Sequence, residues 1–194
     1  MSASSSAHNL KCNEIWGGIQ AAESSASVPG IDAWVICKPH MGAVGGGDIY
    51  YVGLCGRGMK SRFVVADVSG HGEVVASYAT KLHDMMEEQM DTVDQSQLVK
   101  ALNEGFPSLV SSEHFATAVI MSYTPMAKHM VVVNAGHPRP LWYSRRKNRW
   151  QILSHDVSEG ADKLLELPSD VAARSAIDVH WSSANWLSAS VIPT

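Results

Sequence analysis

Apolar positions along the chain change their period, and this change predicts which segments are strands and which are helices. Four segments rich in Val, Ile, Tyr or Phe and bounded by Gly or Pro are typical of strands. They are 33–38, 48–55, 62–67 and 116–123, and three more follow around 130–134, 141–144 and 150–153. Between the third and fourth segments, apolar residues recur at helical spacing from Val75 to Met90 and from Leu98 to Phe106, which predicts two consecutive helices.

The second of these helices has clear boundaries. Asp94 followed by Gln97 three positions later fits an N-cap and its reciprocal partner, and Gly105 and Pro107 end the helix. Strands followed by two helices and then by more strands favour antiparallel sheets with helices packed outside. We therefore expect a layered α+β fold rather than a doubly wound nucleotide-binding fold.

Length and composition are those of one globular domain, with 194 residues of which 45% are hydrophobic and 18% are charged. The segments 1–7 and 21–27 consist of small and polar residues. We therefore expect residues 1–30 to be partly flexible and residues 31–194 to form the compact domain.

Charge and cysteine content exclude several classes of protein. The net charge is only −4 and the basic cluster at 145–149 is local, so nucleic acid is not an expected partner. Cys12, Cys37 and Cys55 are odd in number and lack metal-ligand spacing, which indicates a reducing compartment. No apolar run approaches the roughly 18 residues of a membrane span and no secretory signal is visible, so we expect a cytoplasmic protein without a membrane anchor.

Two aspartates stand at strand ends beside glycine-rich segments. Asp48 follows three consecutive glycines, whereas Asp67 ends an apolar strand and precedes the sequence Ser-Gly-His-Gly. A Gly-Arg-Gly turn separates the two strands, and a hairpin centred between Arg57 and Gly58 brings Asp48 directly opposite Asp67. In that register the side chains lie on one face of the sheet, with Cβ atoms about 5 Å apart.

Two like charges placed in this way are destabilising, so a positive group is expected between them. A hard divalent cation such as Mg²⁺ or Mn²⁺ prefers carboxylate, carbonyl and water oxygens, and no Lys or Arg follows either aspartate closely. On spacing alone, an aspartate that only caps a turn or a helix explains the pattern equally well.

Four motifs resemble those of the bacterial metal-dependent protein phosphatases (PPM family) in their order and approximate spacing. They are GGGDIYYVG, VVADVSGHG, FATAVIM and NAGHPRPLWY, and the resemblance covers about residues 34–150. That branch is similar to the sporulation and stress-response regulators that dephosphorylate phosphoserine on anti-sigma-antagonist proteins. The resemblance implies an antiparallel β-sandwich flanked by helices, with two Mn²⁺ or Mg²⁺ ions at one edge and a bridging water that attacks phosphorus.

The resemblance also assigns roles to single residues. Asp67 corresponds to the carboxylate that bridges both ions, Asp48 to a ligand of one ion, and Val68 to the contributor of a backbone carbonyl. The loop beside the ions, where small residues let a phosphoryl group approach, consists of Ser69, Gly70, His71 and Gly72. His71 could donate a proton there, but an exposed or structural His71 is the favoured interpretation.

Three further polar residues of the motifs are expected to be structural. Thr117 lies in the strand motif FATAV, and Asn134 and His137 mark the turn NAGHP. Their side chains are expected to satisfy backbone groups rather than to contact substrate.

The chain departs from the family pattern after Trp150. Family members continue into an aspartate followed by Gly and later into an Asp-Asp-x-Thr-like segment, and neither is recognisable here. The later aspartates, none of them followed by Gly, are Asp156, Asp162, Asp170 and Asp178. We therefore expect an atypical tail at 155–194, a domain incomplete at its C-terminal end, and either one metal ion or the two of the family.

Two further expectations follow from this departure. A phosphatase-like domain without its full ligand set is either a weak enzyme or an inactive binding module in a regulatory pathway. An uncovered sheet edge or apolar face would favour a homodimer.

Overall fold

The computed structural model describes residues 7–39, 43–55, 59–111, 113–144 and 148–153, and the backbone of three strands at 165–166, 175–180 and 187–192. Within these residues the strands are β1 (His8–Asn9), β2 (Glu14–Gln20), β3 (Ala22–Val28), β4 (Ile31–Cys37), β5 (Gly45–Cys55), β6 (Lys60–Val68), β7 (Ala116–Thr124), β8 (His129–Ala135), β9 (Leu141–Ser144), β10 (Arg149–Ile152), β11 (Leu165–Glu166), β12 (Ser175–His180) and β13 (Leu187–Ile192). The helices α1 (Glu73–Glu88) and α2 (Gln95–Gly105) and the 3₁₀ turn η2 (Phe106–Ser108) lie between β6 and β7.

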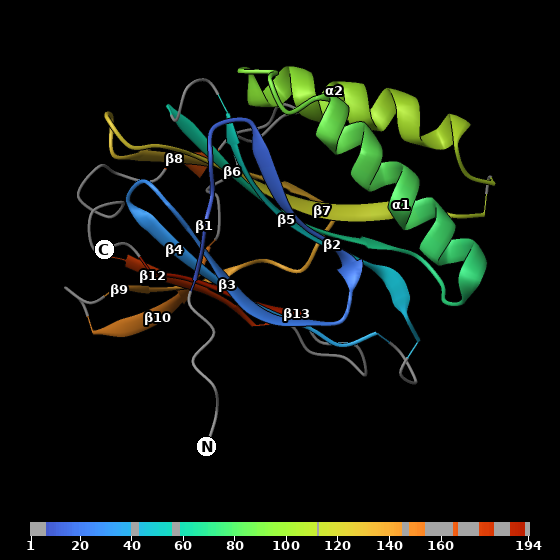
Figure 1. Cartoon of the computed structure of the whole chain (residues 1–194), viewed down its shortest axis with the longest axis horizontal. Helices are drawn as coiled ribbons and strands as arrows, with labels where there is room; N and C mark the ends of the chain where they lie inside the picture. The colour runs from blue at the N-terminus through green and yellow to red at the C-terminus, as the bar shows by residue number, and fades with distance from the viewer. Residues whose placement is uncertain are drawn as a thin grey trace.

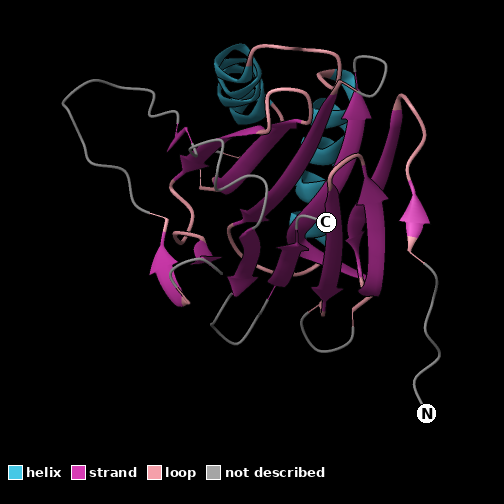
Figure 2. Ribbon diagram, turned by 90° about the vertical axis from the view of Figure 1, so that its left-hand side faces the viewer, coloured by secondary structure: helices cyan, strands magenta, loops and turns pink. Residues whose placement is uncertain are grey.

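The described strands form two sheets that face each other, and both helices lie outside one of them (Figure 1). The sheet beneath the helices has six strands in the order β11-β8-β7-β6-β5-β2. The other has seven, in the order β1-β3-β4-β13-β12-β9-β10. Figure 2 shows the same layers from the side, with the two helices on one outer face. The predicted α+β sandwich with antiparallel sheets and flanking helices is confirmed, apart from a short parallel pair between β1 and β3.

The six-stranded sheet is buried on both faces, which explains why its central strands read as nearly continuous apolar runs. Alternate residues of each strand face opposite layers. On β6, Phe63 and Val65 join the core between the two sheets, whereas Val64 and Ala66 join the core beneath the helices. Burial on both faces therefore explains why consecutive residues of β6 are apolar.

The helices cover the sheet with one apolar face each. The buried apolar residues of α1 and α2 share helical spacing and are Val75, Ala79, Leu82, Met86, Leu98 and Leu102. Asp94 has the predicted N-cap role, since its carboxylate accepts hydrogen bonds from the backbone N–H groups of Ser96 at 2.8 Å and Gln97 at 3.3 Å.

A buried arginine ties the helices to the sheet. Arg62 of β6 is 1% exposed, and its guanidinium donates to the backbone carbonyls of Gln89 at 3.3 Å, Met90 at 3.1 Å and Thr92 at 2.6 Å. These carbonyls lie just beyond the C-terminal end of α1, where a cation is favoured by the helix dipole. Arg62 thus fixes the connection between α1 and α2.

The N-terminal region corrects one expectation. Residues 21–27 are not a loose segment, because β3 pairs with β4 along its whole length, from Ala22 opposite Cys37 to Val28 opposite Ile31. The preceding strand, β2, pairs with β5 at the edge of the six-stranded sheet. Small polar residues form strands here because neighbouring strands supply the hydrogen bonds, which local composition does not report.

The atypical tail contributes strands to both sheets. β12 and β13 lie between β4 and β9 in the seven-stranded sheet, and β11 pairs with β8. Asp178 lies on β12, whereas Asp156, Asp162 and Asp170 fall outside the described residues. Of the helices in the described part of the chain, none is long and apolar enough to cross a membrane.

Candidate active site at the edge of the sandwich

The hairpin of β5 and β6 has the predicted register. Its pairs run from Cys55 opposite Lys60 at the turn to Asp48 opposite Asp67 at the far end. Asp67 lies two residues beyond Val65, which belongs to the core between the sheets, and Asp48 lies two residues before Tyr50, which belongs to the same core. Because side chains alternate along a strand, both carboxylates continue this inner face past the end of the core.

A cavity of about 140 Å³ lies at this edge. Apart from its two aspartates and one histidine, it is lined by small residues; the full set is Ala43, Gly45, Gly46, Gly47, Asp48, Asp67, Gly70, His71 and Gly72. Asp48 is half-buried, whereas Asp67 and His71 are exposed. The cavity therefore brings together both predicted aspartates and three of the four predicted loop residues.

The electrostatics of the cavity disfavour two free carboxylates. Burial, and secondarily the charge of Asp67, raise the pKa of Asp48 from its ordinary value of 3.8 to about 6. Although the residue as a whole is exposed, partial burial of its carboxyl also raises the pKa of Asp67. Both shifts mean that the negative charges lack compensation within the protein, which is the condition that a bound cation relieves.

Gly47 keeps the space beside these carboxylates open. A Cβ atom at this position would lie 2.5 Å from the carbonyl oxygen of Val68 and 3.4 Å from Oδ1 of Asp67. The Val68 oxygen is therefore so close to Gly47 that any side chain at position 47 would force the backbone to move. Two carboxylates in one small cavity, with a backbone carbonyl beside its wall, are the donor types that a hard divalent cation prefers, so the residues present fit such an ion.

The loop after β6 is fixed at one end and bends sharply. The backbone N–H of Ser69 donates to the carbonyl of Phe115 at 2.9 Å, and the N–H of Phe115 donates to Oγ of Ser69 at 3.0 Å. Gly70 and Gly72 have φ angles of 103° and 95°, which favour glycine. Ser69 therefore holds the loop against the start of β7, and the glycines let the chain turn around the cavity into α1.

Thr117 continues the row of the two aspartates onto a third strand. It lies opposite Asp67 in the pairing of β6 with β7, and its Oγ1 is 2.6 Å from Nδ1 of His137. Asn134 holds His137 by its backbone: the Asn134 amide donates to the carbonyl of His137 at 2.9 Å and accepts from its N–H at 2.8 Å. The expectation that Asn134 satisfies backbone groups is confirmed, whereas Thr117 contacts a side chain.

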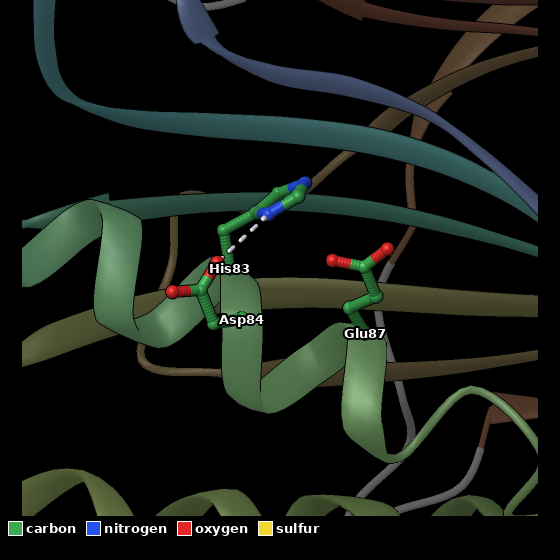
Figure 3. Close-up of side chains that lie close together, drawn as sticks. All are labelled: His83, Asp84 and Glu87. Carbon is green, nitrogen blue, oxygen red and sulfur yellow. Dashed lines mark ion pairs between the residues drawn. The ribbon is translucent and has the colours of Figure 1, made fainter.

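Another group of ligand-type side chains lies on α1, outside this cavity. His83, Asp84 and Glu87 have potential ligand atoms within 4.8 Å of one another, and Nδ1 of His83 is 3.8 Å from Oδ1 of Asp84 (Figure 3). Both carboxylates are exposed to water. The His83 ring packs edge-on against Tyr51, with centroids 6.2 Å apart, so packing and solvation account for this group.

Comparison with known proteins connects this geometry to a family. A sequence model described as stage II sporulation protein E (SpoIIE) matches residues 57–167, more than half of the chain. The matched region contains Asp67 and the loop that follows it but begins after Asp48. No curated protein sequence gives a significant match.

Several solved structures share the fold at low sequence identity. The RsbU and RsbW domains of Rv1364c from Mycobacterium tuberculosis superpose with a TM-score of 0.62 at 20% identity, over 79% of this chain and 44% of that one. The chain thus spans less than half the length of that protein. RsbX in complex with magnesium gives 0.66 at 12% identity, over 89% and 100% of the two chains.

The same fold occurs in the PP2C phosphatase domain of the cell fate determinant SpoIIE from Bacillus subtilis. That structure, which includes a fragment of the regulatory domain, gives a TM-score of 0.65 at 9% identity. The alignment covers 93% of this chain and 70% of that one.

Proposed function

Because this chain belongs to the SpoIIE family of bacterial PPM-type phosphatases, we propose that it is a metal-dependent serine/threonine protein phosphatase. Its reaction is the hydrolysis of phosphoserine or phosphothreonine on a signalling protein. The observation that carries the proposal is the placement of Asp48 directly opposite Asp67 in one small cavity, with the Val68 carbonyl beside the Gly47 that lines it.

The proposed cofactor is Mn²⁺ or Mg²⁺, and RsbX, which shares the fold, was solved with magnesium. Asp67 and Asp48 would be the charged ligands that hold the metal, and the Val68 carbonyl would supply a neutral ligand. When bound, the metal supplies a water of lowered pKa as the nucleophile. The protein positions the metal ligands at the edge of the sandwich and leaves space beside them for the phosphoryl group.

The reaction needs no covalent intermediate. Water oxygen forms a bond to phosphorus, the bond from phosphorus to the serine or threonine oxygen breaks, and that oxygen takes up a proton as it leaves. Gly70 and Gly72 present no side chain to the cavity, so the phosphoryl group meets backbone there. His71 lines the cavity and is exposed, and we assign it to the wall rather than to proton transfer.

The primary test is metal-dependent phosphate release from an aryl phosphate and from a phosphoserine peptide. Activity should require Mn²⁺ or Mg²⁺ and stop on chelation, fall to background in Asp67→Asn and fall sharply in Asp48→Asn. Asp84→Asn, which removes an exposed carboxylate of α1, is the matched control and should keep full activity. Hydrolysis that persists in excess chelator would reject the mechanism.

A binding module is the second candidate, and one observation favours it. Among the described residues, only two carboxylates line the cavity. An ion held by so few charged ligands is weakly neutralised, so a domain of this kind could recognise a phosphoprotein without hydrolysing it. Calorimetric Mn²⁺ titration, which counts one bound ion or two, together with tight partner binding in the absence of turnover, would select this alternative.

The proposed partner is a phosphorylated protein similar to an anti-sigma antagonist, by analogy with the regulators that share the fold. The proposed compartment is the cytoplasm, where the free thiols of Cys12 and Cys37 would stay reduced. A phosphoproteomic comparison of cells with and without the protein would identify the substrate by its increased phosphorylation in the absence of the enzyme.

We also propose self-association as a homodimer. The outer face of the seven-stranded sheet carries exposed large apolar residues on β4 and β10, namely Trp34, Ile36, Trp150 and Ile152. Exposed apolar residues on a sheet face are commonly covered by a partner. Light scattering should give twice the chain mass, and a monomeric mass at micromolar concentration would count against the proposal.

A further inference from the structure

The two aspartates belong to a longer row of polar residues that crosses three strands. Asp48 on β5 pairs with Asp67 on β6, and Asp67 pairs with Thr117 on β7. Directly opposite residues of antiparallel strands point to the same face, with Cβ atoms about 5 Å apart. Val119, two residues after Thr117, belongs to the core between the sheets, so Thr117 faces the same side as both carboxylates.

His137 ends this row and is held firmly in place. It is 7% exposed, and its Nδ1 lies 2.6 Å from Oγ1 of Thr117. The two hydrogen bonds from Asn134 to its backbone fix the turn that carries the ring. Burial lowers the pKa of His137 to about 3, so the ring is neutral at physiological pH and carries one N–H.

A neutral ring leaves two ways to form the contact with Thr117. If the hydroxyl donates to Nδ1, its oxygen lone pairs face the neighbouring carboxylate, which is unfavourable. If Nδ1–H donates to Oγ1, the hydroxyl hydrogen is available for the carboxylate on β6. The second arrangement turns the Thr117 lone pairs away from the carboxylate and lets both the Nδ1–H and the hydroxyl act as donors.

We propose that His137, acting through Thr117, positions the carboxylate of Asp67 for metal binding. In this arrangement, His137 orients the Thr117 hydroxyl, and the hydroxyl donates to Asp67. Such a bond restricts the rotation of the carboxylate and stabilises its ionised form, which is the form that binds a cation. This inference rests on the proposed function, because it treats Asp67 as a metal ligand.

The role assigned here differs from simple satisfaction of buried polar groups. If Thr117 and His137 only satisfied each other's hydrogen bonds, their substitution would change folding stability and leave the affinity for the ion unchanged. Groups that orient a metal ligand through hydrogen bonds instead change the affinity for the ion, typically by about 10-fold to 100-fold. Metal affinity measured apart from catalysis therefore separates the two roles.

The test compares two substitutions of Thr117 by calorimetric titration with Mn²⁺. Thr117→Val keeps the shape and removes the hydroxyl, and should weaken Mn²⁺ binding about 10-fold or more. Thr117→Ser keeps the hydroxyl and should stay within about threefold of the wild type by the same argument. Thr124→Val removes a hydroxyl from the other end of β7 and should bind Mn²⁺ as the wild type does.

A second pair of variants tests His137 in the same titration. His137→Asn keeps an amide that can donate from about the position of Nδ1 and should bind Mn²⁺ more tightly than His137→Leu, which cannot donate.

Equal Mn²⁺ affinity for Thr117→Val and the wild type would overturn this inference while leaving the proposed function intact. Equal weakening in Thr117→Val and Thr117→Ser, with equal loss of thermal stability, would reduce the role to packing and overturn it as well. A wild-type protein that takes up no Mn²⁺ would overturn both proposals.

Discussion

The two ends of β6 handle charge in opposite ways. At one end, Arg62 is buried, and backbone carbonyls beyond α1 together with Oγ of Ser122 surround its guanidinium. At the other end, Asp67 faces Asp48, and among the described residues no Lys or Arg lines their cavity. β6 thus carries a cation whose hydrogen-bond partners are all internal at one end and an anion that faces a second anion on β5 at the other.

This difference separates a structural group from a functional one. Partial negative charges at a helix C-terminus compensate Arg62, so nothing from outside is needed and the result is a fixed helix connection. Burial removes water from both aspartates and raises their pKa values, and the charge of Asp67 adds to the shift at Asp48. A protein that places such a pair at an open edge gains from binding a cation, so charge left uncompensated by the fold indicates the site.

The largest effect on stability is expected at the structural end. Arg62→Met removes the donors from three backbone carbonyls and should lower the free energy of unfolding by about 2–4 kcal/mol. Urea denaturation measures the change. Arg149→Met on β10, where the arginine is exposed and contacts Gln151, is the matched control and should change stability by less than about 0.5 kcal/mol. An Arg62→Met protein as stable as the wild type would remove the contrast between the two ends.

Gly47→Ala should damage the functional end by filling the space beside the ligands. The new Cβ would meet the Val68 oxygen at 2.5 Å, so the backbone must shift, at a cost of about 1–3 kcal/mol and with weaker Mn²⁺ binding. Gly46→Ala is the matched control, because the nearest atom to its Cβ would be 3.9 Å away. Mn²⁺ titration and thermal denaturation of both variants check this prediction, which fails if the two behave alike.

Asp48→Asn should have the opposite effects on stability and function. The folded pKa of about 6 exceeds the ordinary value of 3.8, so the native state holds the proton more tightly between about pH 4 and 6. Protonated Asp48 therefore contributes to the free energy of unfolding below pH 4, and this contribution is lost as the pH rises through 6. Without metal at pH 7, Asp48→Asn should be about 1–2 kcal/mol more stable than the wild type, allowing for partial exposure.

Denaturation in the presence of chelator at pH 4 and pH 7 checks this sign. The two proteins should differ little at pH 4 and diverge at pH 7, while other titrating groups such as His137 cancel in the comparison. Added Mn²⁺ should then stabilise the wild type more than the variant. A variant less stable than the wild type at pH 7 without metal would show that burial and the charge of Asp67 do not destabilise the ionised Asp48.

The sequence predicts the functional end of β6 better than the structural end. A short glycine turn fixes the register of β5 and β6, so the meeting of Asp48 and Asp67 follows from residue numbers alone, and the structure has that register. The sequence does not predict the role of Arg62, because a charged residue at the start of an apolar strand is expected to be exposed to solvent. Its partners lie 27 to 60 positions away along the chain.

Distance along the chain also explains which other features could not be predicted from the sequence. Thr117 joins the row of aspartates through the pairing of β6 with β7, which are separated by two helices, so no turn fixes that register in the sequence. Residues 21–27 form β3 because β4 pairs with them, although their composition suggests a flexible segment. Contacts set by local turns and periodicity are predictable, whereas those set by packing of distant strands are not.

The smallest effect is expected for His71→Ala, which refines the functional end without removing it. His71 lines the cavity but is exposed, and the neighbouring glycines already give the loop its shape. A wall residue should cost less than about tenfold in kcat, whereas a proton donor to the leaving group would cost about 100-fold or more and change the pH profile. The kcat of His71→Ala and its pH dependence, measured at saturating Mn²⁺, distinguish the two. A loss of about 100-fold or more would move His71 from the cavity wall to the chemistry, and the site would then include an acid as well as two ligands.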